Sequence, residues 1–320
     1  MPRVTVGGRI HVGFQNLSLA HDRLYGGIGI ALDQPRLVLD AEPADSVICD
    51  GADVAGYVER AVEVLGVPGA NVTIEQRLPR HVGLGSGTRL ALASLRAIAA
   101  AYDRSVDVRA AAPKLARGGR SGVGVATFET GGFVVDSGHP TTLFTHEPPG
   151  EGEWQVPPVI ARHDVPDDWR FVLVTPDVDA GRHGRPEDES IRAVVERADP
   201  GIADEIALVV TRQLFPAVAT GDHEQFGTAV ERLGRLNGAW YADEQGGVYR
   251  PPAGSVIEAL DSIPEIAGAG QSSWGPTVYG VTHAPQADAA RDRVEDALDD
   301  LGLDGTVRVV SASNSGAQIE

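Results

Sequence analysis

The segment LPRHVGLGSGTRLAL, residues Leu78–Leu92, decides the fold because it joins two elements of different type. The run before it, Asn71–Gln76, alternates apolar and polar side chains, which predicts a strand. Apolar residues after it recur at helical spacing: Leu92, Leu95, Ile98, Ala99 and Tyr102. Between the two, Gly83, Gly85 and Gly87 leave the backbone free to adopt positive φ angles and to approach a ligand closely. We therefore predict a strand, a glycine loop and a helix in succession.

The glycine loop has two interpretations from its sequence alone. Backbone N–H groups at a helix start, together with the positive end of the helix dipole, form a site for phosphate. The alternative is a tight strand-to-helix turn that holds no ligand. If the loop does bind phosphate, the residues that we expect to bind it are Gly83, Gly85, Ser86, Gly87 and Thr88.

Composition restricts the class of protein. A chain of 320 residues suits two domains, and 42% hydrophobic residues provide a sizeable core, which excludes a disordered acidic chain. The net charge is −18, and Lys114 is the single lysine. Such an acid-rich surface suits a cytoplasm at molar salt, where repulsion between carboxylates is screened, so we expect a halophilic protein. The absence of a basic patch argues against nucleic acid as a partner.

Cysteine usage and hydropathy indicate a cytoplasmic protein. The single cysteine, Cys49, excludes an internal disulfide and any cysteine-based metal cluster. The N-terminus carries no apolar core of signal-peptide length, and no stretch approaches the ~18 apolar residues of a membrane span. We expect no membrane contact.

The order of predicted elements indicates an α+β chain of two domains. Strand-like runs fill 4–49, a helix is expected at Asp53–Leu65, and the loop Gly118–Gly124 should lead into a hairpin through 126–128 and 133–136. A proline-rich stretch at 145–168 reads as a linker. The second half opens on a strand at 171–175. Further elements are expected as helices at 187–198, 202–218, 222–236, 253–261 and 284–301, and strands at 277–282 and 306–311. We place the domains at residues 1–165 and 166–320.

Familiar catalytic motifs are absent. A P-loop requires a lysine before Ser or Thr, and Lys114 precedes Leu115. Ser86 does not lie in a nucleophile elbow, which argues against a serine hydrolase, and no Rossmann fingerprint or HExxH motif occurs. Two more glycine-rich segments, Gly26–Gly29 and Gly268–Pro276, join the glycine loop as candidates for one site at a domain interface.

Among nine scattered histidines, none has the spacing of metal ligands. His11 differs from the others because it lies in a strand-like run just before the polar residues Gln15 and Asn16, and near Arg23. It is either a candidate for a functional role or a histidine that is hydrogen-bonded within the sheet.

Several segments resemble a known family. LPRHVGLGSGT resembles the phosphate loop of the GHMP superfamily of small-molecule kinases, and GAGQSSWGPTVYG resembles its third, C-terminal glycine motif. Three further segments, RIHVGFQNLSLAHDRLYGGIGIAL, RGGRSGVGVATFETGGFVVDSGH and TPDVDAGRHGRPEDE, are similar to the β-ribofuranosylaminobenzene 5′-phosphate synthase family. The resemblance runs nearly end to end.

This resemblance implies a fold and a reaction. The fold would be the two-domain GHMP-kinase-like fold, with an N-terminal domain like ribosomal protein S5 domain 2 and a ferredoxin-like C-terminal domain. The reaction would join phosphoribosyl pyrophosphate to 4-aminobenzoate and release CO2 and pyrophosphate, in methanopterin-type pterin synthesis. A 4-hydroxybenzoate-type acceptor is equally compatible with the residues. Pyrophosphate chemistry implies Mg2+ and no organic cofactor, and the family suggests a homodimer.

The resemblance also implies roles for individual residues. The residues expected at the catalytic centre are His11, Asn16, Arg23, Arg120 and Ser121. Those expected to bind the substrates are Gly26, Gly27, Arg182, Arg185, Ser272, Ser273 and Trp274. The arginines would neutralise the anionic substrate, and the three residues of the third motif would close the site from the second domain.

Two departures from the family patterns bear on the alternatives. Gly124 stands where GHMP kinases have a catalytic aspartate, which disfavours the alternative of an ATP-dependent kinase acting on a small alcohol. Asn16 stands where synthases of methane-producing archaea have an aspartate, and it supports the second alternative, a non-catalytic ligand-binding homologue.

Overall fold

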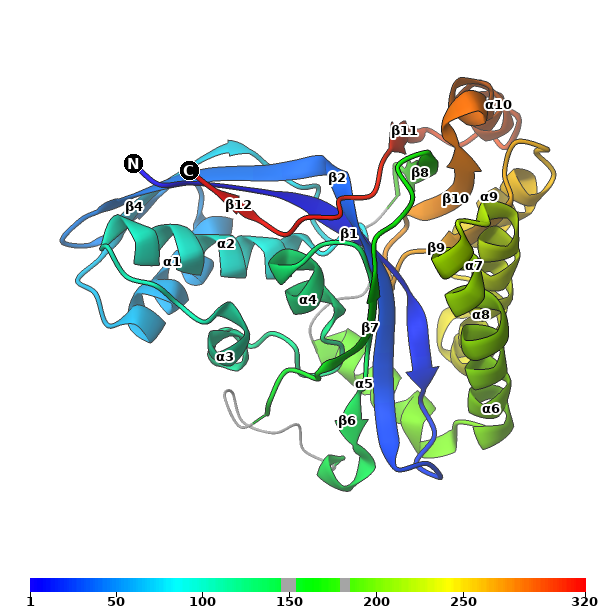
Figure 1. Cartoon of the computed structure of the whole chain (residues 1–320), viewed down its shortest axis with the longest axis horizontal. Coiled ribbons are helices and arrows are strands. Elements are labelled where there is room, and N and C mark those ends of the chain that lie inside the picture. The colour runs from blue at the N-terminus through cyan, green and yellow to red at the C-terminus, as the bar shows by residue number, and fades with distance from the viewer. Residues whose placement is uncertain (145–153, 179–184) are drawn as a thin grey trace.

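The computed structural model describes residues 1–144, 154–178 and 185–320. Two long antiparallel strands, β1 (Arg3–Asn16) and β2 (Arg23–Pro43), run through the middle of the molecule (Figure 1). Each joins two runs that the sequence predicts as separate strands, since register shifts after Gly7 and His11 bend the pair without ending it.

The first sheet has eight strands in the described residues. Its main order is β12-β1-β2-β4-β3, while β5 and β6 pair with β2, and β7 pairs with β5. Its remaining strands are β3 (Val47–Cys49), β4 (Ala70–Gln76), β5 (Phe133–Asp136), β6 (His139–Pro140), β7 (Val159–His163) and β12 (Gln318–Ile319). The helices of this half are α1 (Ala52–Leu65), α2 (Ser86–Ala101), α3 (Val108–Ala111) and α4 (Val123–Glu129), with short turns η1 (Ala112–Leu115) and η2 (Thr141–Leu143).

The expected hairpin after the second glycine loop is wrong in its first arm. Residues 126–128 belong to α4, whereas 133–136 form β5 as predicted. Val125 and Phe128 pack in the core of the first half, and Val123 and Ala126 pack in a smaller cluster with β5. Because α4 is buried all round, its short apolar run shows no helical periodicity and reads equally well as a strand.

The second sheet has four antiparallel strands in the order β11-β8-β10-β9. They are β8 (Trp169–Pro176), β9 (Gly268–Gln271), β10 (Val278–His283) and β11 (Gly305–Val310). Its helices are α5 (Arg185–Arg197), α6 (Pro200–Val209), η3 (Val210–Leu214), α7 (Phe215–Thr220), α8 (His223–Gln245), α9 (Ala253–Asp261), η4 (Ala284–Gln286) and α10 (Ala287–Asp300). Helices follow β8, and α10 joins β10 to β11, which is the βαββαβ order of the predicted ferredoxin-like domain.

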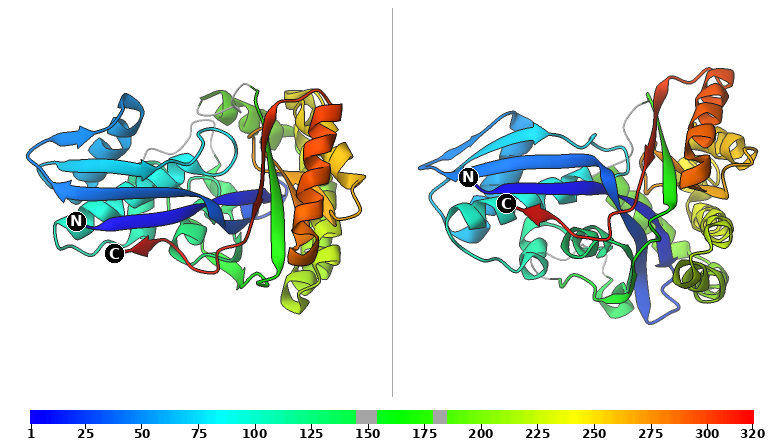
Figure 2. Two further views of the ribbon diagram at one scale, coloured as in Figure 1. Left: turned by 90° about the horizontal axis from the view of Figure 1, so that it is seen from above. Right: turned by 45° about the horizontal axis from the view of Figure 1, so that its top comes forward.

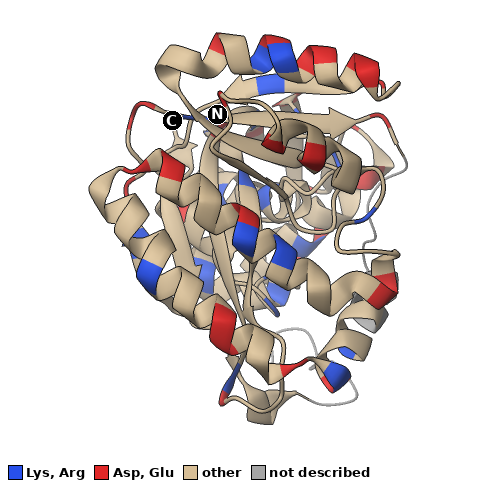
Figure 3. Cartoon of the chain, turned by 90° about the vertical axis from the view of Figure 1, so that its right-hand side faces the viewer, with Lys and Arg blue, Asp and Glu red and all other residues tan. Residues whose placement is uncertain are grey.

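Helix α8 runs nine residues past its predicted end at 236, to Gln245. Asn237 and Gly238 have low helix propensity, but the Asn237 amide hydrogen-bonds Phe14 of β1 and Leu233 one turn earlier. This tertiary contact overrides the local preference. Acidic and basic residues are interspersed on the exposed faces of the helices of this half (Figure 3).

The two halves share one core. Ile10 and Ile28 of the β1–β2 pair belong to the same buried cluster as Trp169 and Phe226 of the second half. The rings of Phe133 and Phe226 meet edge-to-face, with centroids 6.1 Å apart. After β11 the chain returns to the first sheet, where Ile319 pairs with Val4, so both termini lie side by side (Figure 2). The domain boundary between 165 and 166 stays a prediction.

None of the helices in the described ranges is long and apolar enough to cross a membrane.

Candidate functional site

The glycine loop has the geometry that its sequence predicts. Strand β4 ends at Gln76, and α2 begins at Ser86. Gly83 and Gly85 have φ angles of 95° and 79°, a region that favours glycine. No side chain caps the start of α2, and its first turn holds no acidic residue. The backbone N–H groups of this turn therefore keep the positive potential that suits an anion.

Two arginines lie beneath the loop. The Arg9 guanidinium donates to the Gly83 carbonyl. Arg89, in the first turns of α2, is fully buried and donates to the Gly7 carbonyl at 2.9 Å and to Thr127 Oγ1 at 2.9 Å. Burial, and then the charge of Arg9, lower the pKa of Arg89 to about 9. Its hydrogen-bond partners among the described residues are all neutral, so its positive charge adds to the potential at the start of α2.

Arg117 also lies at the start of α2, although the sequence did not single it out. Its guanidinium stacks over the Tyr57 ring, 5.4 Å from the centroid. A Cβ built on Gly87 would lie 3.7 Å from Arg117 Nη2, which places the guanidinium beside the loop. Its only sequence signal was its place directly before Gly118, as the first residue of the RGGRSGVG segment.

The third glycine motif closes onto the same loop. Ser272 Oγ donates to the Gly83 carbonyl at 2.8 Å and accepts from the His11 N–H at 3.1 Å. The Ser273 N–H donates to the His11 carbonyl at 3.1 Å. A Cβ on Gly275 would lie 2.1 Å from the Val82 backbone, so this close approach requires glycine. Segments about 190 residues apart are thus joined at His11.

The His11 side chain begins a line of three hydrogen-bonded groups, which we call the His–Ser–Asp line. His11 Nε2 lies 3.2 Å from Ser121 Oγ, and Ser121 Oγ lies 3.3 Å from Asp136 Oδ2. Asp136 is fully buried and also accepts from the N–H groups of Gly122 at 2.7 Å and Gly138 at 2.8 Å. A Cβ on Gly27 would lie 2.0 Å from Ser121 Oγ, so only glycine leaves room for the line.

Burial sets the charges along this line. Burial raises the pKa of Asp136 to about 6, against the lowering effect of its hydrogen bonds. Burial and the charge of Arg9 lower the pKa of His11 to about 3. At neutral pH the imidazole is therefore neutral and the carboxylate is mostly ionised. Asp136 supplies the negative charge of the site, although we did not single it out from the VVDSGH segment.

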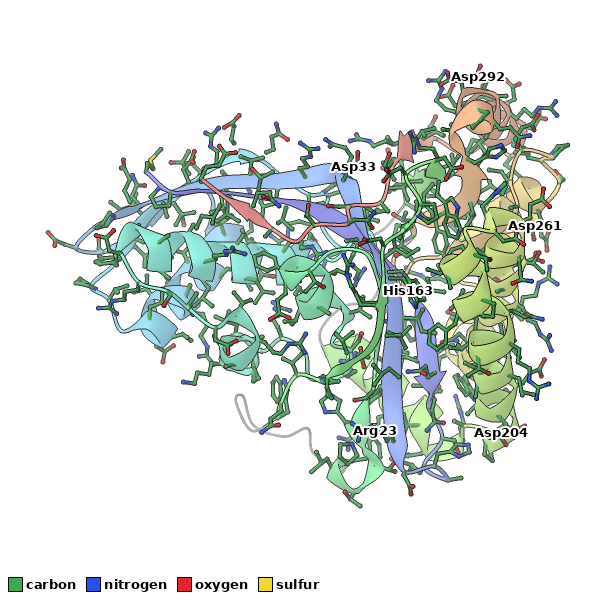
Figure 4. The ribbon with its side chains drawn as sticks, in the orientation of Figure 1. Arg23, Asp33, His163, Asp204, Asp261 and Asp292 are labelled. Atoms are coloured by element: carbon green, nitrogen blue, oxygen red, sulfur yellow. The ribbon has the colours of Figure 1, made fainter. Side chains whose placement is uncertain are left out.

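Asn16 and Arg23 hold the tip of the β1–β2 hairpin. The Asn16 amide donates to the carbonyls of Ser18 and Arg23 and accepts from the Ser18 N–H. Arg23, near the end of the hairpin in Figure 4, donates to the Ser137 carbonyl at 2.6 Å and to the Ser137 hydroxyl at 3.0 Å. Arg23 thereby positions the loop after Asp136, and Asn16 holds the turn that carries Arg23.

Two arginines act on Tyr25 electrostatically. Burial raises the pKa of Tyr25, and the charges of Arg120 and Arg192 act in the opposite direction, so both guanidinium groups lie within electrostatic range of the phenol. The ring of Tyr25 meets that of His139 edge-to-face, with centroids 6.3 Å apart. Arg192, on α5, joins the predicted Arg120 here, and the two could hold a phosphate.

The remaining predicted residues fall into three groups. A Cβ on Gly26 would lie 2.5 Å from Gln15 Nε2, so Gly26 belongs to the turn beside the His–Ser–Asp line. Trp274 is nearly buried and packs on Tyr241 of α8. Arg182 lies outside the described residues; Arg185 begins α5, and its side chain lies outside them as well.

Comparisons with known proteins agree with this architecture. The model of the GHMP kinases N terminal domain matches residues 53–132, and that of the GHMP kinases C terminal domain matches residues 214–300. A β-ribofuranosylphenol 5′-phosphate synthase of Methanothermobacter thermautotrophicus is 30% identical over 98% of this chain and 97% of its own. The synthase of that name from Archaeoglobus fulgidus is 31% identical over 100% of both chains. The chain belongs to the β-ribofuranosylphenol 5′-phosphate synthase family.

Solved structures show the GHMP fold. A putative homoserine kinase from Listeria monocytogenes covers 100% of this chain with 99% of its own, at a TM-score of 0.64 and 19% identity. A mevalonate kinase from L. major, in complex with R-mevalonate, covers 98% with 96% of its own, at a TM-score of 0.70 and 15% identity. The predicted family and fold class are thereby confirmed.

Gly124 lies beside the start of α2. A Cβ at this position would lie 3.1 Å from Thr88 Cγ2, in the first turn of α2. A side chain here would therefore point at the glycine loop. That GHMP kinases carry their catalytic aspartate at this position stays a prediction from the resemblance, and this chain has glycine there.

Proposed function

We propose that this protein is a phosphoribosyl transferase that joins phosphoribosyl pyrophosphate to a 4-substituted benzoate and releases CO2 and pyrophosphate. The observation that carries the proposal is the convergence of the glycine loop, the third motif and the His–Ser–Asp line at His11. The name of the relatives describes a ribofuranosyl phenol, which favours 4-hydroxybenzoate over 4-aminobenzoate as the acceptor.

The chemistry balances without an external acid or base. The bond between ribose C1 and the pyrophosphate oxygen breaks, and pyrophosphate leaves with the electron pair. The ring carbon that bears the carboxylate forms a bond to C1. The bond to the carboxylate then breaks, CO2 leaves, and its electron pair restores the aromatic ring.

The residues have roles that follow from their charges. The N–H groups at the start of α2, supported by Arg9, Arg89 and Arg117, would stabilise the departing pyrophosphate. Arg120 and Arg192 would hold the 5′-phosphate. The negative charge of Asp136, next to Ser121, would oppose the positive charge that develops at ribose C1.

Magnesium would enter the site with the substrate's pyrophosphate. No group of three or more His, Cys, Asp or Glu side chains within the described residues could hold a metal ion, and the hydrogen bonds of Asp136 occupy both of its oxygens. Mg2+ belongs to the proposal only as the counterion that the substrate's pyrophosphate brings with it. A homodimer and a cytoplasmic, high-salt environment are also proposals, and light scattering in molar KCl tests the dimer.

One assay tests the proposed function. The purified protein is incubated in high salt with Mg2+, phosphoribosyl pyrophosphate and carboxyl-labelled 4-hydroxybenzoate or 4-aminobenzoate, and labelled CO2 is measured. We expect release that depends on both substrates. ATP consumption on a small alcohol without CO2 release would favour a GHMP kinase instead. Binding of the sugar phosphate without turnover in either assay would favour a non-catalytic homologue.

A further inference from the structure

A partly open pocket with a cavity volume of about 60 Å³ lies between β1, α8 and the third glycine motif. Four aromatic side chains from distant segments line it: Phe14, Tyr241, Tyr249 and Trp274. Tyr241 and Trp274 meet edge-to-face, with centroids 4.7 Å apart and planes at 72°. Aromatic side chains that interact in this way form an apolar wall on which another aromatic ring can pack.

The side chains that line this pocket are uncharged, although the Arg235 guanidinium lies beside one of them, Tyr249. None of the described residues that line it is Asp, Glu, Lys or Arg, and the low pKa of His11 keeps its imidazole neutral. Its polar groups include the amides of Gln245 and Gln271 and the phenol of Tyr249. Burial of a charged group without a partner is unfavourable, whereas a neutral hydroxyl or amine can be satisfied by one hydrogen bond.

One wall of the pocket is shared with the glycine loop. His11 and Ser273 both line the pocket, and the Ser273 N–H donates to the His11 carbonyl. Ser272 bridges His11 to the Gly83 carbonyl on the other side. A ring in the pocket would therefore lie next to a sugar whose pyrophosphate is bound at the start of α2.

The opposite wall offers one hydroxyl to a ligand. The amide of Asn237 is already engaged with the Phe14 backbone, at 2.8 and 3.1 Å, so it holds β1 in place. The buried Tyr249 hydroxyl has the Arg235 guanidinium as its hydrogen-bonding neighbour, and its own O–H is left to donate to a ligand. A Cβ on Gly234, another lining residue, would lie 3.0 Å from this hydroxyl, which places it at the pocket wall.

We propose that this pocket binds the aromatic acceptor, with its para substituent at Tyr249 and its carboxylate-bearing carbon toward the glycine loop. The inference rests on the proposed function, because that carbon must face ribose C1. It also assigns a specificity. A para hydroxyl or amine can exchange a hydrogen bond with the Tyr249 phenol, whereas an unsubstituted benzoate offers no group there.

The test measures binding directly, so it does not depend on turnover. Calorimetry with 4-hydroxybenzoate compares the wild type with Trp274→Leu and Tyr249→Phe. Trp240→Leu is the matched control, since Trp240 is equally buried but does not line the pocket. We expect about tenfold weaker binding in each of the first two variants and unchanged binding in the control. Affinity for inorganic pyrophosphate should stay the same in all three, and benzoate, which lacks the para hydroxyl, should bind the wild type about tenfold more weakly than 4-hydroxybenzoate.

The outcomes separate this inference from the proposed function. Equal affinity for benzoate and 4-hydroxybenzoate would overturn the orientation. Loss of pyrophosphate binding in Trp274→Leu, with 4-hydroxybenzoate binding intact, would overturn the pocket. Binding that depends on Trp274 without CO2 release would support the pocket and reject the reaction. CO2 release by Trp274→Leu with an unchanged KM for the aromatic acid would support the reaction and reject the pocket.

Discussion

Asp136 gives the sharpest prediction, because its buried carboxylate makes stability depend on pH. Its pKa is about 6 in the folded protein, against an ordinary value of 3.8. Between these values the folded state binds more protons than the unfolded state, so stability falls as pH rises. The full difference between the two pKa values corresponds to about 3 kcal/mol of unfolding free energy, at ~1.4 kcal/mol for each pKa unit. Of this free energy, ~2 kcal/mol is lost between about pH 4.5 and pH 7.5.

The variant Asp136→Asn removes this titration. It also changes hydrogen bonds to Gly122 and Gly138, which adds an offset that is independent of pH. The quantity to measure is therefore the difference in unfolding free energy between wild type and variant, by urea unfolding at fixed salt at the two pH values. We expect this difference to shift by ~2 kcal/mol in favour of the variant at the higher pH.

The exposed Asp300→Asn is the matched control and should show no such shift. Parallel pH dependence of wild type and Asp136→Asn would refute the reasoning, because Asp136 would then not titrate in this window. The same variant should also lower the rate of CO2 release, since it removes the negative charge beside Ser121.

Three further predictions follow from the site. His11 should make stability depend on pH in the opposite direction, because burial lowers its pKa from 6.5 to about 3. The wild type should therefore lose roughly 3 kcal/mol of unfolding free energy between about pH 7.5 and pH 4.5, and His11→Gln should not. Equal acid sensitivity of the two proteins in urea unfolding would contradict this. Gly27→Ala should reduce kcat at least ~10-fold and destabilise the fold by about 1–3 kcal/mol, because its Cβ would clash with Ser121. The control Gly56→Ala should do neither, since its Cβ would meet nothing within 4 Å. Equal melting temperatures of the two variants would argue against this clash. Arg120→Ala should raise the KM for phosphoribosyl pyrophosphate at least ~10-fold and leave the melting temperature unchanged. The control is the surface variant Arg232→Ala, which should leave this KM unchanged. Unchanged kinetics in Arg120→Ala would show that Arg120 does not belong to the site.

Local sequence determined the element at the centre of the fold. The alternation before Leu78, the glycines at 83 and 85 and the helical spacing after Leu92 each act within a few residues, so strand, loop and helix could be predicted. The βαββαβ order of the second half was predictable from the family resemblance, which the relatives confirm. Helix α4 was missed because an element buried all round loses the periodicity that identifies it.

Only the tertiary structure decided which groups meet. His11 is 110 residues from Ser121 and 261 from Ser272, and Asn237 reaches Phe14 across 223 residues. No periodicity encodes such contacts, because they depend on how two sheets share one core. The same burial gives Asp136 and His11 their unusual pKa values, since desolvation acts on a group only once other segments cover it. The glycine loop could be predicted from the sequence, but the protonation states of Asp136 and His11 and the aromatic pocket beside the loop arise from folding.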